Sequence, residues 1–390
     1  MDTKLIYLDH AATTPVHPKV LEAMLPYFSE KFGNPSSIYS IARETRAGLD
    51  HARDTVAEIL GAKANEIIFT SGGSESDNLA IKGVALSQRK RGNHIITSPI
   101  EHHAVSHTCE YLQKHFGFEI THVSVDKHGV VDLDALATAI RPTTTLITIM
   151  MANNEVGTIE PIEEIAKMIK GKGIFFHTDA VQATGSLDIN VDRLGVDMLS
   201  MSAHKFYGPK GVGALYVSRG TSILPQQQGG GQERHRRAGT ENTAGIVGTA
   251  TALKMSYDEM ESRNEHARKL RDKLIAGITK IDRTILTGHP TNRLPNNASF
   301  CFEFVEGESI LLNLDMLGIA ASSGSACTSA SLEPSHVLRA MGIPVEIAHG
   351  SLRLTTGMDN DEEQIDRVIT ALPGIIAKLR AMSPLASSAS

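Results

Sequence analysis

One stretch of sequence indicates the fold: Phe175-Phe176-His177-Thr178-Asp179-Ala180-Val181-Gln182, in which a short apolar run ends in a carboxylate. A second apolar run leads into Ser202-Ala203-His204-Lys205-Phe206-Tyr207-Gly208-Pro209, which carries a lysine at the corresponding place. Polar side chains at the carboxyl ends of parallel strands face the ligand crevice of an open α/β sheet. We therefore expect Asp179 and Lys205 to meet at one edge of such a sheet.

Short apolar runs alternate with longer amphipathic segments from about residue 60 to residue 220. Seven of these runs have the character of strands: 66–69, 94–97, 120–125, 146–150, 174–176, 198–201 and 212–217. Strands separated by helical segments are typical of a mostly parallel sheet with helices on both faces. The sequence predicts an α/β fold with a seven-stranded sheet of this kind.

The C-terminal part of the chain has a different pattern. A helical region over about 241–281 leads out of the sheet, and a strand, a helix, another strand and a last helix follow it. The chain has 390 residues, 41% of them hydrophobic, which is enough for two domains with their own cores. We therefore expect a second, smaller α+β domain.

Composition restricts the partners and the compartment. The net charge of −6 gives no general attraction to nucleic acid or to anionic lipid, so we expect neither as a partner. No run approaches the roughly 18 apolar residues of a membrane span, and the first residues lack a signal-peptide layout. The three cysteines are odd in number and widely spaced, which fits a reducing compartment. The sequence predicts a cytoplasmic protein.

A lysine and an aspartate at one crevice edge are what pyridoxal phosphate requires. The lysine forms a Schiff base, and the aspartate keeps the ring nitrogen protonated so that the ring accepts electrons. Alternatively, Lys205 is a solvated lysine at the end of a strand. The cofactor is favoured because Asp179 closes an apolar run, and a carboxylate buried there without a cationic partner would be costly. Gln182 in the same turn is placed to bind the ring hydroxyl.

A glycine-rich turn offers a place for the phosphate. The run ending at Phe69 is followed by Thr70-Ser71-Gly72-Gly73-Ser74-Glu75-Ser76-Asp77, where Ser74 and Asp77 form a capping-box pattern at a helix start. Open backbone N–H groups at a positive helix end hold phosphate. The alternative is a well-capped helix without a ligand. Two side chains beside the lysine could bind the same phosphate: Ser202 and His204.

Histidines give one further candidate and argue against a metal. His102 follows a strand and could stack on a pyridine ring, although any one of the 17 histidines is more often a surface or core residue. His103 and His107 have the i, i+4 spacing of a metal pair, but no third ligand accompanies them. We therefore expect no metal site.

Three other features are candidates for the same site. Asn153-Asn154-Glu155 places amides at the end of a strand, although an Asn-rich turn is the alternative. Arg353 lies on an apolar strand and would bind a substrate carboxylate, or else form a structural ion pair. Cys327 lies in a run of ten small residues, 322–331, which should be mobile and leave its thiol accessible.

Taken together, these motifs resemble cysteine desulfurases of the NifS/IscS type. The resemblance runs in order along nearly the whole chain, at 7–15, 33–37, 71–78, 101–102, 153–155, 177–182, 202–211, 237–242 and 323–329. It implies fold type I of the pyridoxal-phosphate enzymes and a homodimer. It also implies a large cofactor-binding domain, 15–257, and a small domain from 1–14 and 258–390 that carries the catalytic cysteine.

The resemblance also implies roles for individual residues. Lys205 would carry the Schiff base, Asp179 would bind the ring nitrogen, and Cys327 would accept the sulfur. His102 would stack on the ring, with Gln182 and Asn154 on the ring-hydroxyl side. The phosphate would be held by Gly73, Ser74, Ser202 and His204, with Thr240 from the neighbouring subunit. The substrate carboxylate would be bound by Asn34 and Arg353.

The implied reaction converts L-cysteine to L-alanine and leaves a persulfide on Cys327, which passes sulfur to an acceptor such as an iron–sulfur scaffold protein. Two alternatives stay open: a selenocysteine lyase or β-eliminating enzyme on the same scaffold, and a docking partner in a sulfur-transfer assembly. A purely structural role is disfavoured, because it does not require Lys205, Asp179 and Cys327 together. The sequence leaves the acceptor open between iron–sulfur assembly, nitrogenase maturation and tRNA thiolation.

Overall fold

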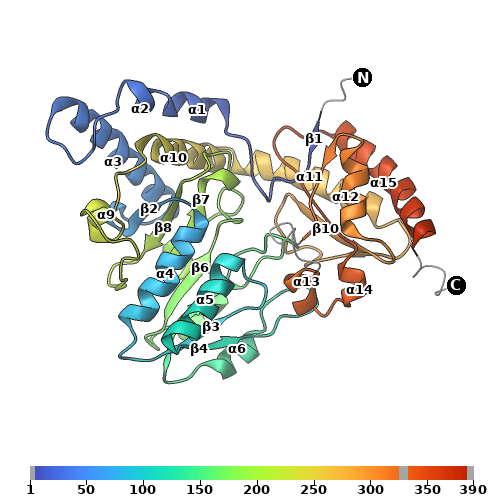
Figure 1. Ribbon diagram of the computed structural model, residues 1–390, viewed down its shortest axis with the longest axis horizontal. Helices are drawn as coiled ribbons and strands as arrows, with labels where there is room; N and C mark the ends of the chain where they lie inside the picture. The colour runs from blue at the N-terminus through green and yellow to red at the C-terminus, as the bar shows by residue number, and fades with distance from the viewer. Residues whose placement is uncertain (1–4, 325–332, 384–390) are drawn as a thin grey trace.

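The computed structural model describes residues 5–324 and 333–383, and its largest element is a seven-stranded sheet (Figure 1). The strand order is β2-β8-β7-β6-β5-β3-β4, and β8 runs antiparallel to both of its neighbours whereas the remaining pairs are parallel. The predicted mostly parallel sheet is therefore confirmed. The strands are β2 (Ile67–Thr70), β3 (His94–Thr97), β4 (Glu119–His122), β5 (Thr144–Thr148), β6 (Phe175–Asp179), β7 (Met198–Ser202) and β8 (Gly213–Val217).

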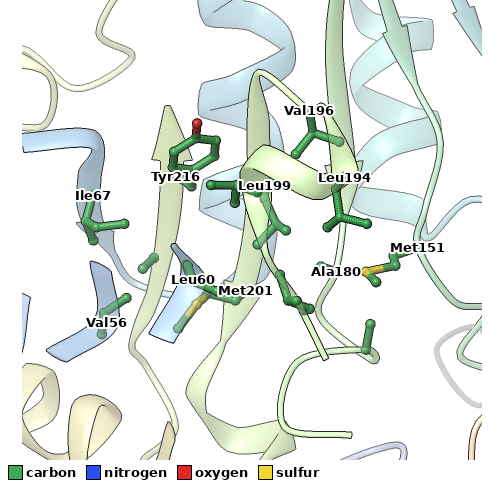
Figure 2. Close-up of a cluster of buried hydrophobic side chains, with 14 of the residues drawn as sticks. Val56, Leu60, Ile67, Met151, Ala180, Leu194, Val196, Leu199, Met201 and Tyr216 are labelled. Carbon is green, nitrogen blue, oxygen red and sulfur yellow. The ribbon is translucent and has the colours of Figure 1, made fainter. Parts of the chain in front are cut away.

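Helices cover both faces of this sheet because successive strand residues point to opposite sides. Leu199 and Met201 of β7 pack in one core with α3 (Ser40–Leu60) and α10 (Thr243–Asp258), and Figure 2 shows part of this cluster. Met198 lies in the core of the other face, with α4 (Gly73–Ser87) and α5 (His103–Phe116). Most of the strand residues are buried on both faces of the sheet, which explains why the strands appear in the sequence as apolar runs.

A smaller set of elements gathers the two ends of the chain (Figure 1). The N-terminal strand β1 (Ile6–Tyr7) pairs in parallel with β11 (Ile319–Ala320). The antiparallel sheet of β12 (Ser351–Thr355), β10 (Asn297–Phe302) and β9 (Thr284–Leu286) packs with three helices around a separate core that includes Ile6 and Phe300. The helices are α11 (Met260–Ile278), α12 (Gly307–Asp315) and α15 (Glu362–Met382). We propose on this basis that 1–14 and 258–390 form one domain and 15–257 the other.

The predicted helical region over 241–281 is two helices, because the backbone at Glu259 (φ −110°, ψ 10°) leaves the helical region and ends α10. Among the described residues, no helix is both long and apolar enough to cross a membrane. The remaining elements are α1 (Pro18–Met24), α2 (Pro26–Ser29), α6 (Leu133–Ala139), α7 (Ile162–Ile169), α8 (Val191–Leu194), α9 (Gln232–His235), α13 (His336–Ala340), α14 (Val345–Ala348) and the 3-10 turns η1 (Ala64–Glu66) and η2 (Ala203–Lys205).

Candidate active site

Asp179 and Lys205 lie at the same edge of the sheet and line one cavity of about 480 Å³. Asp179 is the last residue of β6, and Lys205 ends the turn η2 that follows β7, the neighbouring parallel strand. The cavity collects ten of the residues singled out from the sequence: Gly73, Ser74, His102, Asn154, Asp179, Gln182, Ser202, His204, Lys205 and Arg353. Nine of them end or follow strands of the large sheet, whose carboxyl ends meet at one edge, whereas Arg353 comes from β12 of the smaller sheet.

Two of the residues singled out from the sequence, Asn34 and Thr240, are not brought into this cavity. Asn34 is exposed between α2 and α3, where its Oδ1 accepts a hydrogen bond from the Ser36 N–H at 2.9 Å, so a single chain gives it no place beside a substrate. Thr240 is also exposed and outside the cavity of its own chain, which is compatible with a role in a neighbouring subunit. Cys327 lies outside the described residues.

The amine of Lys205 is held by the N-terminal segment. Its Nζ donates to the carbonyl oxygens of Ala11 and Ala12 at 2.6 and 2.8 Å, and Gln182 Nε2 donates to the same Ala11 oxygen at 2.9 Å. These two alanines were not among the predicted site residues, because a backbone carbonyl has no signature in the sequence. The only available signal was the motif 7–15, which contributed to the family resemblance.

Asp179 is a buried carboxylate with an unusual environment. Its Oδ1 accepts a hydrogen bond from the Val181 N–H at 2.9 Å, and its side chain is almost fully buried. Burial raises its pKa, whereas the Val181 N–H and the charge of Lys205 oppose that shift. Burial also raises the pKa of Asp77 on the same cavity wall, and Asp179 raises it further. A cationic N–H donor in the cavity would offset the cost of burying the Asp179 carboxylate, and a protonated pyridine nitrogen is such a donor.

The glycine-rich turn is built differently from the capping box predicted for it. Helix α4 begins at Gly73 with Gly72 as its N-cap, and no side chain caps it, so Ser74 lies inside the first turn. The prediction is wrong because Glu75, not Asp77, reaches back to accept the Ser71 N–H at 2.7 Å, while Asp77 is buried.

The helix start is nevertheless suited to an anion. Gly72 has a φ of 151°, which favours glycine. A Cβ at Gly73 would lie only 2.7 Å from Val181 Cγ2, so the backbone can approach the cavity only without a side chain. Ser202 lies beside this turn, since its Oγ would be 3.7 Å from a Cβ at Gly72. The uncapped N–H groups and the serine hydroxyls of the cavity wall fit a phosphate.

His102 is a neutral imidazole at the N-terminus of α5. Its Nδ1 accepts a hydrogen bond from the Ala104 N–H at 3.1 Å, so the proton of the neutral ring resides on Nε2. Burial, and then the charge of Lys205, lower its pKa to about 4. The same causes lower the pKa of His204 to about 4, so both rings are uncharged near neutral pH.

Glu101, next to His102, is expected to make the stability of the protein depend on pH. Burial raises its pKa from 4.5 to about 8, although the Ser98 hydroxyl and the Met150 N–H donate to it at 2.6 and 3.0 Å. The stability contributed by the neutral carboxyl is therefore fully present below pH 4.5 and is lost as the pH rises through about 8.

The variant Glu101→Gln cannot ionise, so its free energy of unfolding should fall less than that of the parent protein over this pH range. The expected difference is on the order of a few kcal/mol. Urea unfolding of both proteins at several pH values measures it. Identical pH dependence in the two proteins would contradict a neutral Glu101.

Arg353 has partners within the protein as well as a face on the cavity. Its Nη2 contacts Asp9 Oδ1 at 2.8 Å, and its Nη1 donates to the Asn154 carbonyl oxygen at 2.9 Å. The structural ion pair considered as the alternative is therefore present. The Nε atom is buried and has no hydrogen-bond partner among the described residues. A substrate carboxylate on this guanidinium remains a prediction.

Other cavity residues were missed or set aside in the sequence analysis. Glu155, Ser335 and His336 also line the cavity, and His336 Nε2 contacts the Glu101 carbonyl oxygen at 2.9 Å. The rings of His103 and His336 lie 4.8 Å apart, and His103 stacks on His107 at 4.7 Å. Within 5–324 and 333–383, no group of three His, Cys, Asp or Glu side chains is arranged to hold a metal ion.

Comparison with known proteins identifies the family. Residues 6–368 match the family model Aminotransferase class-V. The chain is 56% identical to cysteine desulfurase IscS of Methanosarcina thermophila, covering 98% of this chain and 95% of that protein. It is 55% identical to cysteine desulfurase IscS of Dictyoglomus turgidum, with 97% and 96% covered.

Solved structures agree with these sequence relatives. A NifS-like protein superposes with a TM-score of 0.91 at 39% identity, over 96% of this chain and all of that chain. SspA in complex with cysteine gives 0.80 at 38% identity, over 90% and 99%. The fold, the sequence relatives and the structural relatives all lead to the same assignment. The chain belongs to the class-V aminotransferases and, within them, to the cysteine desulfurases of the NifS/IscS type.

Proposed function

We propose that this protein is a cysteine desulfurase that uses pyridoxal phosphate to convert L-cysteine to L-alanine, with a persulfide on Cys327 as the sulfur carrier. One observation carries the proposal: Lys205, Asp179 and His102 line a single cavity together with the uncapped start of α4. Relatives that are named cysteine desulfurase and span nearly the whole chain support it.

The cavity residues fit the cofactor group by group. Lys205 would bind it covalently, the buried carboxyl of Asp179 would face the ring nitrogen, and the first turn of α4 would hold the phosphate. The ring and phosphate would also contact His102, Asn154, Gln182, Ser202 and His204. When bound, pyridoxal phosphate withdraws electrons from the α-carbon of an amino acid and acidifies its C–H bond.

The residues of the chain would bind the substrate and move its protons. Arg353, fixed by Asp9, would bind the carboxylate and so point the Cα–H bond of L-cysteine toward the lysine. Lys205 would then accept the α-proton of L-cysteine at Nζ. The Ala11 and Ala12 carbonyls, which accept hydrogen bonds from Nζ, hold the lysine in place and stabilise the resulting ammonium group.

Sulfur transfer requires a thiolate, and two of the three cysteines are unsuited to supply one. Cys109 and Cys301 are fully buried, and burial raises the pKa of both thiols, that of Cys301 to about 12. We therefore assign the attack to Cys327. Its thiolate forms a bond to the substrate sulfur, and the Cβ–S bond breaks with its electron pair remaining on carbon. That carbon takes up a proton and becomes the methyl group of alanine.

The proposal includes a homodimer in the cytoplasm that passes its sulfur to acceptors such as an iron–sulfur scaffold protein. A second copy of the chain is supported by large apolar side chains left exposed along α1, α2 and the following loop: Leu21, Leu25, Phe28, Phe32 and Ile38. A partner subunit covering this region would bury them and could bring Thr240 to the neighbouring phosphate. Sedimentation analysis should accordingly give twice the mass of the chain.

The direct test of the function is an absorption spectrum combined with product analysis. Protein supplied with pyridoxal phosphate should show a band at roughly 400 nm, as expected for a Schiff base. Added L-cysteine should change this band and, with a reductant present, yield alanine and sulfide in equal amounts. L-Selenocysteine assayed in parallel distinguishes a selenocysteine lyase. A preparation that stays colourless, or sulfide accompanied by pyruvate instead of alanine, would contradict the proposal.

A further inference from the structure

Glu155 is a buried carboxyl in the cavity wall for which the proposed mechanism has no use. Only 5% of the residue is exposed, and it lies in the predicted Asn153-Asn154-Glu155 motif. Its Oε2 accepts a hydrogen bond from Ser335 Oγ. A Cβ added to Gly324 would lie only 2.5 Å from the same oxygen. One carboxyl group therefore contacts both Gly324 and Ser335, which are on either side of Cys327 in the sequence.

The position of Glu155 is itself well determined. Its N–H donates to Asn153 Oδ1 at 2.8 Å, and its carbonyl oxygen accepts from Asn297 Nδ2 at 3.2 Å. The neighbouring residue Asn154 is bound through its carbonyl to the guanidinium of Arg353. The carboxyl group is thus attached to the same rigid wall that is proposed to bind the substrate carboxylate.

Ser335 is equally well anchored on the other side of the contact. Its Oγ accepts hydrogen bonds from the N–H groups of Val337 and Leu338 at 3.1 and 3.3 Å, and it is the N-cap of α13. The Glu155–Ser335 hydrogen bond therefore connects the cavity wall to the start of a helix. Gly324 packs against the same carboxyl oxygen because a glycine has no side chain to occupy that space.

We propose that Glu155 is a positioning residue for sulfur transfer, which fixes both attachment points of the stretch carrying Cys327 at the wall of the cavity. The inference rests on the proposed function, because it requires Cys327 as the sulfur acceptor. A nucleophile attached at two fixed points has a higher effective concentration at its target than one attached loosely. Small errors in placement are costly in such a step, with roughly 100-fold in rate for about 1 Å.

The test separates the step that needs Cys327 from the step that does not. Holoenzyme of Glu155→Ala is mixed with L-cysteine, and the change in the cofactor spectrum is followed by stopped flow. Persulfide on Cys327 is then trapped by alkylation at timed intervals and measured by mass spectrometry. We expect the spectral change to stay within about 3-fold of the parent enzyme, whereas persulfide formation falls by about 10- to 100-fold.

Three further variants show whether the effect has the proposed cause. Glu155→Gln keeps an oxygen that accepts from Ser335 and should restore most of the persulfide rate. Gly324→Ala should reproduce the defect, since its Cβ displaces the carboxyl oxygen. Gly374→Ala is the matched control, because a Cβ there has no neighbour within 4 Å, and it should behave like the parent enzyme.

Several outcomes would overturn the inference. An equal loss in the spectral change and in persulfide formation by Glu155→Ala would show that the role of Glu155 is only structural. A persulfide rate in Glu155→Ala like that of the parent enzyme would show that Glu155 does not position Cys327. If Glu155→Ala does not fold, a parent-like rate in Gly324→Ala has the same meaning. Cys327→Ala is measured alongside: sulfide release by that variant refutes the proposed function, whereas its inactivity together with a parent-like Glu155→Ala refutes only the role of Glu155.

Discussion

Replacement of Lys205 by alanine should lower the desulfurase activity by on the order of 1,000-fold or more and remove the absorption band at roughly 400 nm. The reason is that in the proposed mechanism Nζ has two tasks: it carries the covalent bond to the cofactor, and it accepts the α-proton of the substrate. The Ala11 and Ala12 carbonyls hold this nitrogen at the cavity wall, and alanine places no amine there. Absorption spectra and alanine release measure the two effects.

Lys210→Ala is the matched control for this variant. Lys210 is an exposed lysine in the same segment, and its Nζ donates to the Thr14 carbonyl oxygen at 3.5 Å. It should keep both the absorption band and the activity. Thermal unfolding of both variants checks that the fold is retained. A Lys205→Ala protein that kept the band would show that another amine carries the cofactor.

Cys327→Ala is expected to have the second large effect, and a more selective one. In the proposed mechanism no persulfide forms without this thiolate, so sulfide release in the presence of reductant should fall by at least about 1,000-fold. The change of the cofactor spectrum on adding L-cysteine should persist, because the cavity that binds cofactor and substrate is intact. Sulfide assays and rapid-scan spectra of the same preparation measure the two responses.

The other two cysteines provide controls of the same residue type. Cys109→Ala and Cys301→Ala remove thiols that burial keeps protonated, so each should release sulfide at close to the parent rate, once any loss of folded protein is taken into account. Full sulfide turnover by Cys327→Ala would remove Cys327 from the mechanism. Loss of turnover in Cys109→Ala or Cys301→Ala would instead indicate that a buried thiol takes part in sulfur transfer.

The sheet could be predicted because its strands are buried on both faces. Residues 67–70, 198–202 and 213–217 are all buried, so they read as short apolar runs that differ from the amphipathic helices between them. The polar residue after each run was then the natural candidate for the site. This pattern alone is enough to single out Asp179 and Lys205, without the family resemblance.

Helix ends were harder to predict, because several side chains compete for the same backbone groups. At the start of α4, Glu75 reaches the Ser71 N–H, and the expected pair of Ser74 and Asp77 does not form. At Glu259, a break divides what the pattern presented as one helical region. At the start of α4 a local hydrogen bond, not hydrophobic periodicity, determined where the helix is capped.

The sequence by itself determined the α/β sheet, the sheet edge shared by Asp179 and Lys205, and the family, because each depends on residue types in a local pattern. Only the tertiary structure decided what surrounds them. Lys205 is bound by carbonyls 193 and 194 positions away, and Glu155 meets Ser335 across 180 positions. Such contacts form only when the chain ends fold back onto the sheet domain, and a backbone carbonyl or a buried carboxyl gives no local sign of its distant partner.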